Sequence, residues 1–136
     1  MAGVLVDSNV LLDVLTEDHV WFNWSAEQLA IMAESFTLII NPIIYSEVSV
    51  GFATIEELEE CLPVDVFVRQ PLPWEAGFLA GKCLLAYRRS GGVRHSPLPD
   101  FYIGAHAAVA GLTLLTRDVS RYQTYFPKLK LIAPSV

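Results

Sequence analysis

The sequence has few cysteines, no long apolar run and, in its first half, no basic residue. Cys61 and Cys83 lack the spacing of a metal-binding pair, and their apolar helical surroundings favour packing as small hydrophobic side chains. This low cysteine usage fits a reducing, cytoplasmic setting. No apolar run approaches the roughly 18–20 residues that span a bilayer, and no basic region precedes a long apolar stretch at the N-terminus. Neither a membrane span nor a signal peptide is therefore expected.

The basic residues are confined to the second half of the chain. Residues 1–68 contain twelve acids and no Lys or Arg, whereas residues 69–136 contain all nine basic residues and three acids, so formal charges of −12 and +6 make up the net −6. Such asymmetry can mark a polyanion partner on the basic side. Alternatively, the two halves interleave in the fold and part of the asymmetry cancels. The acidic isoelectric point argues against a general nucleic-acid coat protein but allows an enzyme with a local basic rim.

The length and the apolar pattern predict one α/β domain spanning residues 1–136. Short apolar runs alternate with longer segments of helical periodicity, which is typical of a parallel sheet. The predicted strands are residues 3–6, 37–40, 64–69, 112–115 and 129–132. The predicted helices are residues 9–17, 21–34, 42–52, 54–62, 73–89, 100–110 and 119–125. We expect a three-layer α/β/α, doubly wound domain with about five parallel strands in the order 3-2-1-4-5.

Four carboxylates, here called the acidic quartet, are placed where this fold would bring them to one cleft: Asp7, Glu47, Asp100 and Asp118. Asp7 and Asp118 follow the first and fourth strands, which are neighbours at the point where the strand order reverses. Asp100 opens an alanine-rich helix, and Glu47 lies on the apolar face of another helix. Carboxylates in one cleft repel each other unless a cation is present, and hard oxygen ligands suit magnesium or manganese. The quartet indicates a divalent-metal site for phosphodiester chemistry.

Each member of the quartet has a structural alternative. The three aspartates precede or open helices, where aspartate often serves as a cap, although Ser8 or Asn9 could cap the first helix. Glu47 could form a salt bridge with an arginine of the basic half, because an unpaired buried charge costs several kcal/mol. The hypothesis therefore depends on the four acids together. Asp13 and the acids near it are expected on a solvated helix face, as are the glutamates of residues 56–60.

Four segments of the chain resemble, in order, the motifs of one known family. These are VDSNVLLDVL at the start, NPIIYSEV in the middle, LPDFYIGAHAAVAG later and LLTRD before the last strand. Together they resemble the PIN-domain nucleases, and within them the toxin ribonucleases of bacterial VapBC toxin–antitoxin pairs. The resemblance extends from Val4 to Pro134, and four motifs in this order with compatible spacing are specific.

The resemblance implies a role for each polar residue of the motifs. The quartet would be the catalytic acids that hold one or two Mg²⁺ or Mn²⁺ ions. Asp7, Asp100 and Asp118 are the expected metal ligands, with the first two preferred for direct contact. The last acid and the glutamate could also act through water, orient the attacking water or hold a second ion. Asn9 and Thr116 would support the site by hydrogen bonding.

The resemblance also implies a function and partners. Members of this family cleave single-stranded or loop RNA, often transfer or ribosomal RNA, and a small antitoxin protein encoded beside them silences them. We therefore expect a metal-dependent endoribonuclease that acts as a toxin, binds an antitoxin and forms a homodimer.

Basic residues near the late acids are candidates for holding RNA. Arg88, Arg89 and Arg94 precede Asp100, and Arg117 adjoins the last acid, so these side chains could contact phosphates. Alternatively, the adjacent pair of arginines complements a helix C-terminus, and Arg117 pairs with a nearby acid. The three histidines are not spaced as a metal cluster.

Two further features allow more than one interpretation. The cluster of Trp21, Phe22 and Trp24 could belong to the core or to a groove for an antitoxin helix. His106 is expected to be a packing or surface residue.

Functions of other classes fit the sequence less well than a nuclease. A haloacid-dehalogenase-type phosphatase would need a second aspartate two residues after Asp7, where Asn9 stands. A receiver-like signalling domain would need paired acids after the first strand, an aspartate after the third and a lysine after the fifth. This sequence has one acid, Arg69-Gln70-Pro71 and Ala133-Pro134 at those places, which weighs against it. A noncatalytic PIN-like module that binds RNA or protein stays open.

Overall fold

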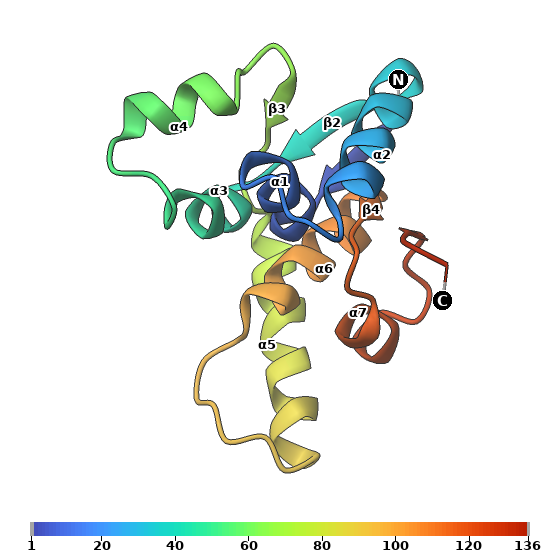
Figure 1. Ribbon diagram of the computed structural model, residues 1–136. Coiled ribbons are helices and arrows are strands. Elements are labelled where there is room, and N and C mark those ends of the chain that lie inside the picture. Colours follow the sequence, from blue (N-terminus) through green and yellow to red (C-terminus); the bar gives the residue numbers. More distant parts are fainter. Residues whose placement is uncertain (1, 136) are drawn as a thin grey trace.

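A parallel sheet forms the centre of the computed structural model, which describes residues 2–135 (Figure 1). The strands are β1 Gly3–Val6, β2 Thr37–Ile40, β3 Phe67–Arg69, β4 Thr113–Leu115 and β5 Leu131–Ile132. Their spatial order is β3-β2-β1-β4-β5, and each neighbouring pair is parallel. The predicted α/β fold and the 3-2-1-4-5 order are confirmed, and β1 lies next to β4.

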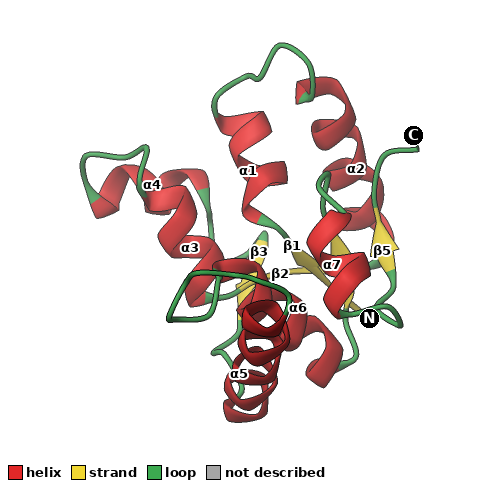
Figure 2. Cartoon of the chain, turned by 90° about the horizontal axis from the view of Figure 1, so that it is seen from below, coloured by secondary structure: helices red, strands yellow, loops and turns green. Residues whose placement is uncertain are grey.

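Helices cover both faces of this sheet. They are α1 Ser8–Leu15, α2 Phe22–Ser35, α3 Pro42–Ser49, α4 Ile55–Cys61, α5 Trp74–Arg89, α6 Pro99–Ala110 and α7 Ser120–Tyr125. Figure 2 shows α1 and α2 on one side of the sheet and α5 and α6 on the other. The expected three-layer arrangement is present, and α3 and α4 extend away from the sheet as an arm (Figure 1).

The central strands are apolar because both of their faces are covered. Val4, Leu5 and Val6 of β1 and Leu114 and Leu115 of β4 have no solvent-exposed surface. Unbroken apolar runs of this kind are expected of parallel strands between two helix layers. The first polar position after β1 is therefore where the buried strand reaches the edge of the sheet.

Two strands are shorter by two residues or more than the sequence predicted, because turns occupy their expected first residues, and β4 is shorter by one residue. The amides of Val66 and Phe67 both donate to the carbonyl of Pro63, at 3.0 and 2.9 Å, and β3 starts only after this turn. The amide of Leu129 donates to the carbonyl of Phe126 at 3.0 Å, and β5 starts two residues later.

Close packing fixes α7 against α6. A Cβ atom on Gly104 would overlap the ring of Phe126, so the absence of a side chain there lets the two segments approach. The rings of Phe101 and Tyr125 meet edge to face, with centroids 4.8 Å apart. The position of α7 beside the end of β1 is thus set by buried aromatic contacts.

Two further predictions concern the packing of the cysteines and the presence of membrane-spanning helices. Cys83 is buried, as expected, and burial raises the pKa of its thiol. Cys61 is exposed at the end of α4, so the prediction that it packs as a hydrophobic side chain is wrong. Within residues 2–135, no helix has the length and apolar character needed to cross a membrane.

Candidate active site

Asp7 lies where β1 ends and is the N-cap residue of α1. Its amide donates to the carbonyl of Leu115 at 2.9 Å, which places it between the two central strands. Its carboxylate is only 3% exposed and accepts three hydrogen bonds of 2.8 Å. The Ser8 amide donates to Oδ1, and the hydroxyls of Thr116 and Tyr122 donate to Oδ2. The cap is therefore Asp7 itself and not one of the two following residues.

The surroundings of this carboxylate favour its protonated form. Burial raises the pKa of Asp7 from its ordinary value of 3.8 to about 6, although the hydrogen bonds from Thr116, Tyr122 and Ser8 oppose the rise. The charge of Asp100 raises the pKa further. A buried carboxylate beside a second acid is the arrangement that a bound cation would stabilise.

Asp100 lies in the first turn of α6 and reaches the same place from the other helix layer. Its Oδ1 is 3.4 Å from the hydroxyl of Tyr122, and its Oδ2 is 3.7 Å from Nε of Arg121. Burial raises the pKa of Asp100, the Arg121 guanidinium lowers it, and the charge of Asp118 raises it. These effects show that the acids of α6 and of the segment after β4 act on one another.

Glu47 of α3 joins the cluster through Ser8. The Ser8 hydroxyl donates to Oε1 of Glu47 at 2.8 Å. Burial raises the pKa of Glu47, this hydrogen bond lowers it, and the charge of Asp100 raises it. The partner of the half-buried glutamate is thus a hydroxyl group, and the alternative of a salt bridge with an arginine is wrong.

Asn9 and Thr116 lie beside the acids in a chain of hydrogen bonds. Asn9 Nδ2 donates to Thr116 Oγ1 at 3.2 Å, and Asn9 Oδ1 accepts from the amide of Arg117 at 3.3 Å. Thr116 donates to Asp7 and accepts from the amide of Asp118 at 3.2 Å. The Asp118 side chain itself is exposed. This network links the ends of β1 and β4.

The carboxylate oxygens suit a hard divalent cation, although the carboxylates do not surround a common point in this structure. Oxygen donors of several acids, with raised proton affinity on Asp7, Glu47 and Asp100, are what Mg²⁺ or Mn²⁺ would bind. Within residues 2–135, no three acidic, histidine or cysteine side chains lie close enough to enclose an ion. Because Mg²⁺ keeps several water ligands, one or two of these carboxylates would be enough to hold it.

Tyr122 is a member of this site that the sequence pattern did not indicate. Its side chain is 1% exposed, and its hydroxyl contacts both Asp7 and Asp100. Burial and the charges of Asp7 and Asp100 raise its pKa far above the ordinary value, so the hydroxyl stays protonated and donates. The only sign of this role in the sequence is an aromatic residue one helical turn after Asp118, and an aromatic residue at that spacing ordinarily indicates core packing.

Asp13 is also misplaced by the sequence analysis. It is 2% exposed, accepts from Ser25 Oγ at 2.7 Å and forms an ion pair with Nε of Arg117 at 2.8 Å. The guanidinium of Arg117 also lies over the ring of Trp21, 5.6 Å from its centroid. The expectation of a solvated Asp13 is wrong, and the alternative that Arg117 pairs with a nearby acid is confirmed.

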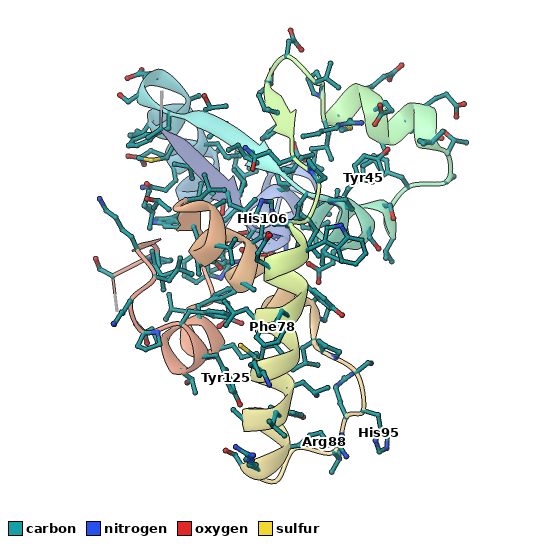
Figure 3. The ribbon with its side chains drawn as sticks, turned by 180° about the vertical axis from the view of Figure 1, so that it is seen from behind. Tyr45, Phe78, Arg88, His95, His106 and Tyr125 are labelled. Carbon is teal, nitrogen blue, oxygen red and sulfur yellow. The ribbon has the colours of Figure 1, made fainter. Side chains whose placement is uncertain are left out.

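The other arginines proposed to bind RNA lie away from the buried acids. Arg88, Arg89 and Arg94 are exposed at the end of α5 and on the following loop. Figure 3 places Arg88 and His95 together at that far end of the molecule. The two arginines of the helix are in the last turn of α5, where they also complement the helix dipole.

The structure places His106 and two members of the aromatic cluster, Trp21 and Trp24, for which the sequence allowed more than one interpretation. His106 is fully buried between Asn41 Nδ2, 2.9 Å from its Nδ1, and Gln70 Oε1, 3.3 Å from its Nε2. Burial lowers its pKa, so it is a neutral packing residue that donates from Nε2 and accepts at Nδ1. Trp24 packs against the core, and Trp21 meets it edge to face at 6.3 Å.

Comparisons with known proteins agree with this fold. A family model for the PIN domain matches residues 4–126. A search of curated proteins finds no match.

Solved structures share the fold at low sequence identity. VapBC2 from Rickettsia felis, bound to a DNA fragment from its promoter, has a TM-score of 0.75 and 17% identity, covering 98% of this chain and 99% of that chain. VapBC-1 from nontypeable Haemophilus influenzae has a TM-score of 0.72 and 18% identity, covering 96% and 97%. A toxin–antitoxin complex from Klebsiella pneumoniae has a TM-score of 0.67 and 19% identity, covering 97% and 98%.

Proposed function

This chain belongs to the PIN-domain family, whose members are nucleases, and from that premise we propose that it is a metal-dependent endoribonuclease. The observation that carries the proposal is the buried carboxylate of Asp7 with Asp100 close by, because the charge of Asp100 raises the pKa of both Asp7 and Glu47. Within residues 2–135 no basic side chain forms an ion pair with Asp7, and a bound cation would balance the charge of these carboxylates at the edge of the sheet.

Magnesium or manganese is the proposed cofactor, held by Asp7, Asp100 and Asp118. When bound, such an ion lowers the pKa of a water ligand and stabilises charge on phosphate oxygens. The hydroxyls of Thr116 and Tyr122 both occupy Oδ2 of Asp7, whereas Oδ1 accepts only the amide of the next residue. Oδ1 is therefore the oxygen of Asp7 with more capacity left for an ion.

Glu47 is the proposed group for orienting the attacking water. Its Oε1 accepts the hydrogen bond from Ser8, which leaves Oε2 free to accept a proton or a hydrogen bond from water. Burial raises its pKa above that of an ordinary glutamate and so toward neutral pH, as general-base catalysis requires.

RNA is the proposed substrate, and exposed arginines would hold its phosphates. Arg88, Arg89 and Arg94 are free to contact a backbone that enters the site along α5 and its loop. Arg117 is the weakest of the four candidates, because its Nε atom already binds Asp13. Arg121, next to Asp100, is a further cation on the path to the acids.

An antitoxin is the proposed partner that silences the enzyme, so that the chain would be the toxin of a type II toxin–antitoxin pair. Structures of the same fold are described as VapBC or toxin–antitoxin complexes, which supports this assignment. Co-purification of this chain with a small protein encoded beside it, together with loss of RNA cleavage in the complex, is the expected result. Full cleavage activity in that complex would contradict it.

A second copy of the chain is the proposed occupant of the outer face of α5. Trp74 is 94% exposed and Phe78 is 70% exposed on that face, and Figure 3 shows Phe78 projecting from the helix. A Cβ on Gly81 would meet open space, so an antiparallel copy of α5 can place its phenylalanine over this glycine. The same pairing brings Glu75 of one copy near Lys82 of the other, which makes the face complementary to itself.

Light scattering after size exclusion tests this dimer. Phe78→Asp should give a monomer, because the change puts a charge into the centre of the contact. Val20→Asp, at a residue 75% exposed in the loop between α1 and α2, should leave the dimer intact. A wild-type chain that is monomeric at all accessible concentrations would contradict the assignment.

Cleavage of a pool of cellular RNAs tests the enzymatic proposal. The purified chain, free of any partner, should cleave RNA with Mg²⁺ or Mn²⁺ but not with EDTA, and Asp100→Asn should abolish cleavage. Asp65→Asn, which removes an exposed carboxylate far along the chain from the quartet, is the matched control and should cleave normally. RNA binding without cleavage that survives Asp100→Asn would favour the noncatalytic module instead.

A further inference from the structure

The hydroxyl of Tyr122 is the contact that directly joins the two acids preferred as metal ligands. It donates to Oδ2 of Asp7 at 2.8 Å and lies 3.4 Å from Oδ1 of Asp100. Asp7 belongs to the end of β1 and Asp100 to the start of α6, so Tyr122 of α7 is the meeting point of three separate segments. A phenol has one hydrogen, and the shorter contact indicates that Asp7 receives it.

Packing of the ring does not require this hydroxyl. A phenylalanine would occupy the same buried space, and it would avoid the cost of burying a polar group. The hydroxyl of Tyr125, three residues later on α7, forms no side-chain hydrogen bond within residues 2–135, although its ring packs on Phe101. A comparison of these two tyrosines therefore distinguishes the effect of an aromatic ring on this helix from the effect of a hydroxyl group beside the acids.

The position of the hydroxyl is fixed by the fold. Gly104 allows Phe126 to pack directly on α6, and the Phe101–Tyr125 contact holds the middle of α7. The Tyr122 side chain is 1% exposed, so it has no room to swing away. A group held this firmly can set the orientation of the carboxylate that it contacts.

We propose that Tyr122 is a positioning residue for the divalent ion: its hydroxyl donates to Oδ2 of Asp7 and fixes the orientation of that carboxylate beside Asp100, so that both acids can bind one Mg²⁺ or Mn²⁺. The inference rests on the proposed function, because it assumes that this cluster binds such an ion. Asp7 Oδ2 is turned toward the hydroxyls of Tyr122 and Thr116, and Oδ1 is left for the ion. Tyr122 itself contacts no ion and exchanges no proton in this role.

Calorimetric titration of the metal-free chain with Mn²⁺ tests the role of the hydroxyl apart from catalysis. Tyr122→Phe keeps the ring and should raise the dissociation constant for Mn²⁺ about tenfold or more, the range seen when a group that orients a metal ligand is removed. Tyr125→Phe is the matched control and should bind Mn²⁺ as the wild type does. Unchanged or tighter binding by Tyr122→Phe would overturn the inference.

Thermal unfolding gives a second readout that does not need a titration curve. The increase in melting temperature on adding Mn²⁺ should be smaller for Tyr122→Phe than for the wild type and the Tyr125→Phe control, since a weaker ligand stabilises less at equal concentration. An equal increase in all three proteins would overturn the role of Tyr122. A wild-type chain that binds no Mn²⁺ would instead reject the metal site, and with it the enzymatic proposal.

Discussion

The buried carboxylate of Asp7 should make the metal-free protein less stable as the pH rises. Its pKa in the folded state is about 6, against an ordinary value of 3.8, so the folded chain binds this proton more tightly than the unfolded chain. The extra stability is fully present below about pH 4 and is lost as the pH rises through about 6. At 1.36 kcal/mol for each pKa unit, the whole change is about 3 kcal/mol, of which roughly half falls between pH 5 and pH 8.

Asp7→Asn removes this titration while keeping the size of the side chain. Urea unfolding in EDTA, at several pH values between about 5 and about 8, should show a steeper loss of unfolding free energy for the wild type than for the variant. Glu47 and Asp100, whose pKa values are also raised, contribute in the same direction in both proteins, so the difference between the two slopes reports mainly on Asp7 and its interaction with Asp100. Asp65→Asn should keep the wild-type slope, because that carboxylate is exposed.

Identical pH dependence in the wild type and in Asp7→Asn would refute this reasoning, since it would mean that burial does not perturb the carboxyl. Saturating Mn²⁺ supplies an internal check on the same preparation. Metal ligands must be deprotonated, so with the ion present the loss of stability at higher pH should disappear or reverse in the wild type only.

Three more predictions, one of them with a matched control substitution, test separate parts of the structure. Asp13→Ala should lower the unfolding free energy by about 2 kcal/mol in urea titrations. The cost is less than that for a fully buried pair because Arg117 keeps access to water, and an unchanged unfolding free energy would argue against the ion pair. Gly104→Ala should cost about 1–3 kcal/mol through overlap with an aromatic ring, whereas Gly77→Ala, which meets open space, should be neutral or stabilising by up to about 1 kcal/mol. Glu47→Gln should slow RNA cleavage about 10²-fold or more, with Mn²⁺ affinity much less affected, and equal loss of both would place Glu47 on the ion rather than on water.

The order of the strands and the meeting of Asp7 with Asp100 follow from patterns that a sequence displays. Unbroken apolar runs separated by helical segments predict a covered parallel sheet, and the right-handed crossovers of such sheets restrict the strand order. A polar residue directly after such a run must then lie at one edge of the sheet. For this reason the place of Asp7 at the edge of the sheet, beside the end of β4, was predictable from the sequence.

The roles of Asp13 and Tyr122 were not predictable in the same way. Asp13 pairs with Arg117, 104 residues later, and Tyr122 contacts Asp7 across 115 residues. Local periodicity carries no signal for a single polar contact between distant segments. It therefore predicted a solvated position for Asp13 on α1, since it does not show that α2 packs against that face. Turns likewise shortened β3 and β5, since the alternation of Val64 and Val66 with a polar residue does not distinguish an exposed turn from a strand.

Anomalous scattering from a crystal of the chain soaked with Mn²⁺ would locate the ion directly. We expect an anomalous peak within coordination distance of the carboxylates of Asp7 and Asp100, roughly 2.0–2.6 Å from their oxygens as for hard divalent ions. We also expect the peak to be weaker in Tyr122→Phe at the same Mn²⁺ concentration. A peak confined to other acids, or none at these carboxylates at saturating Mn²⁺, would contradict the claim that they form the metal site of a nuclease.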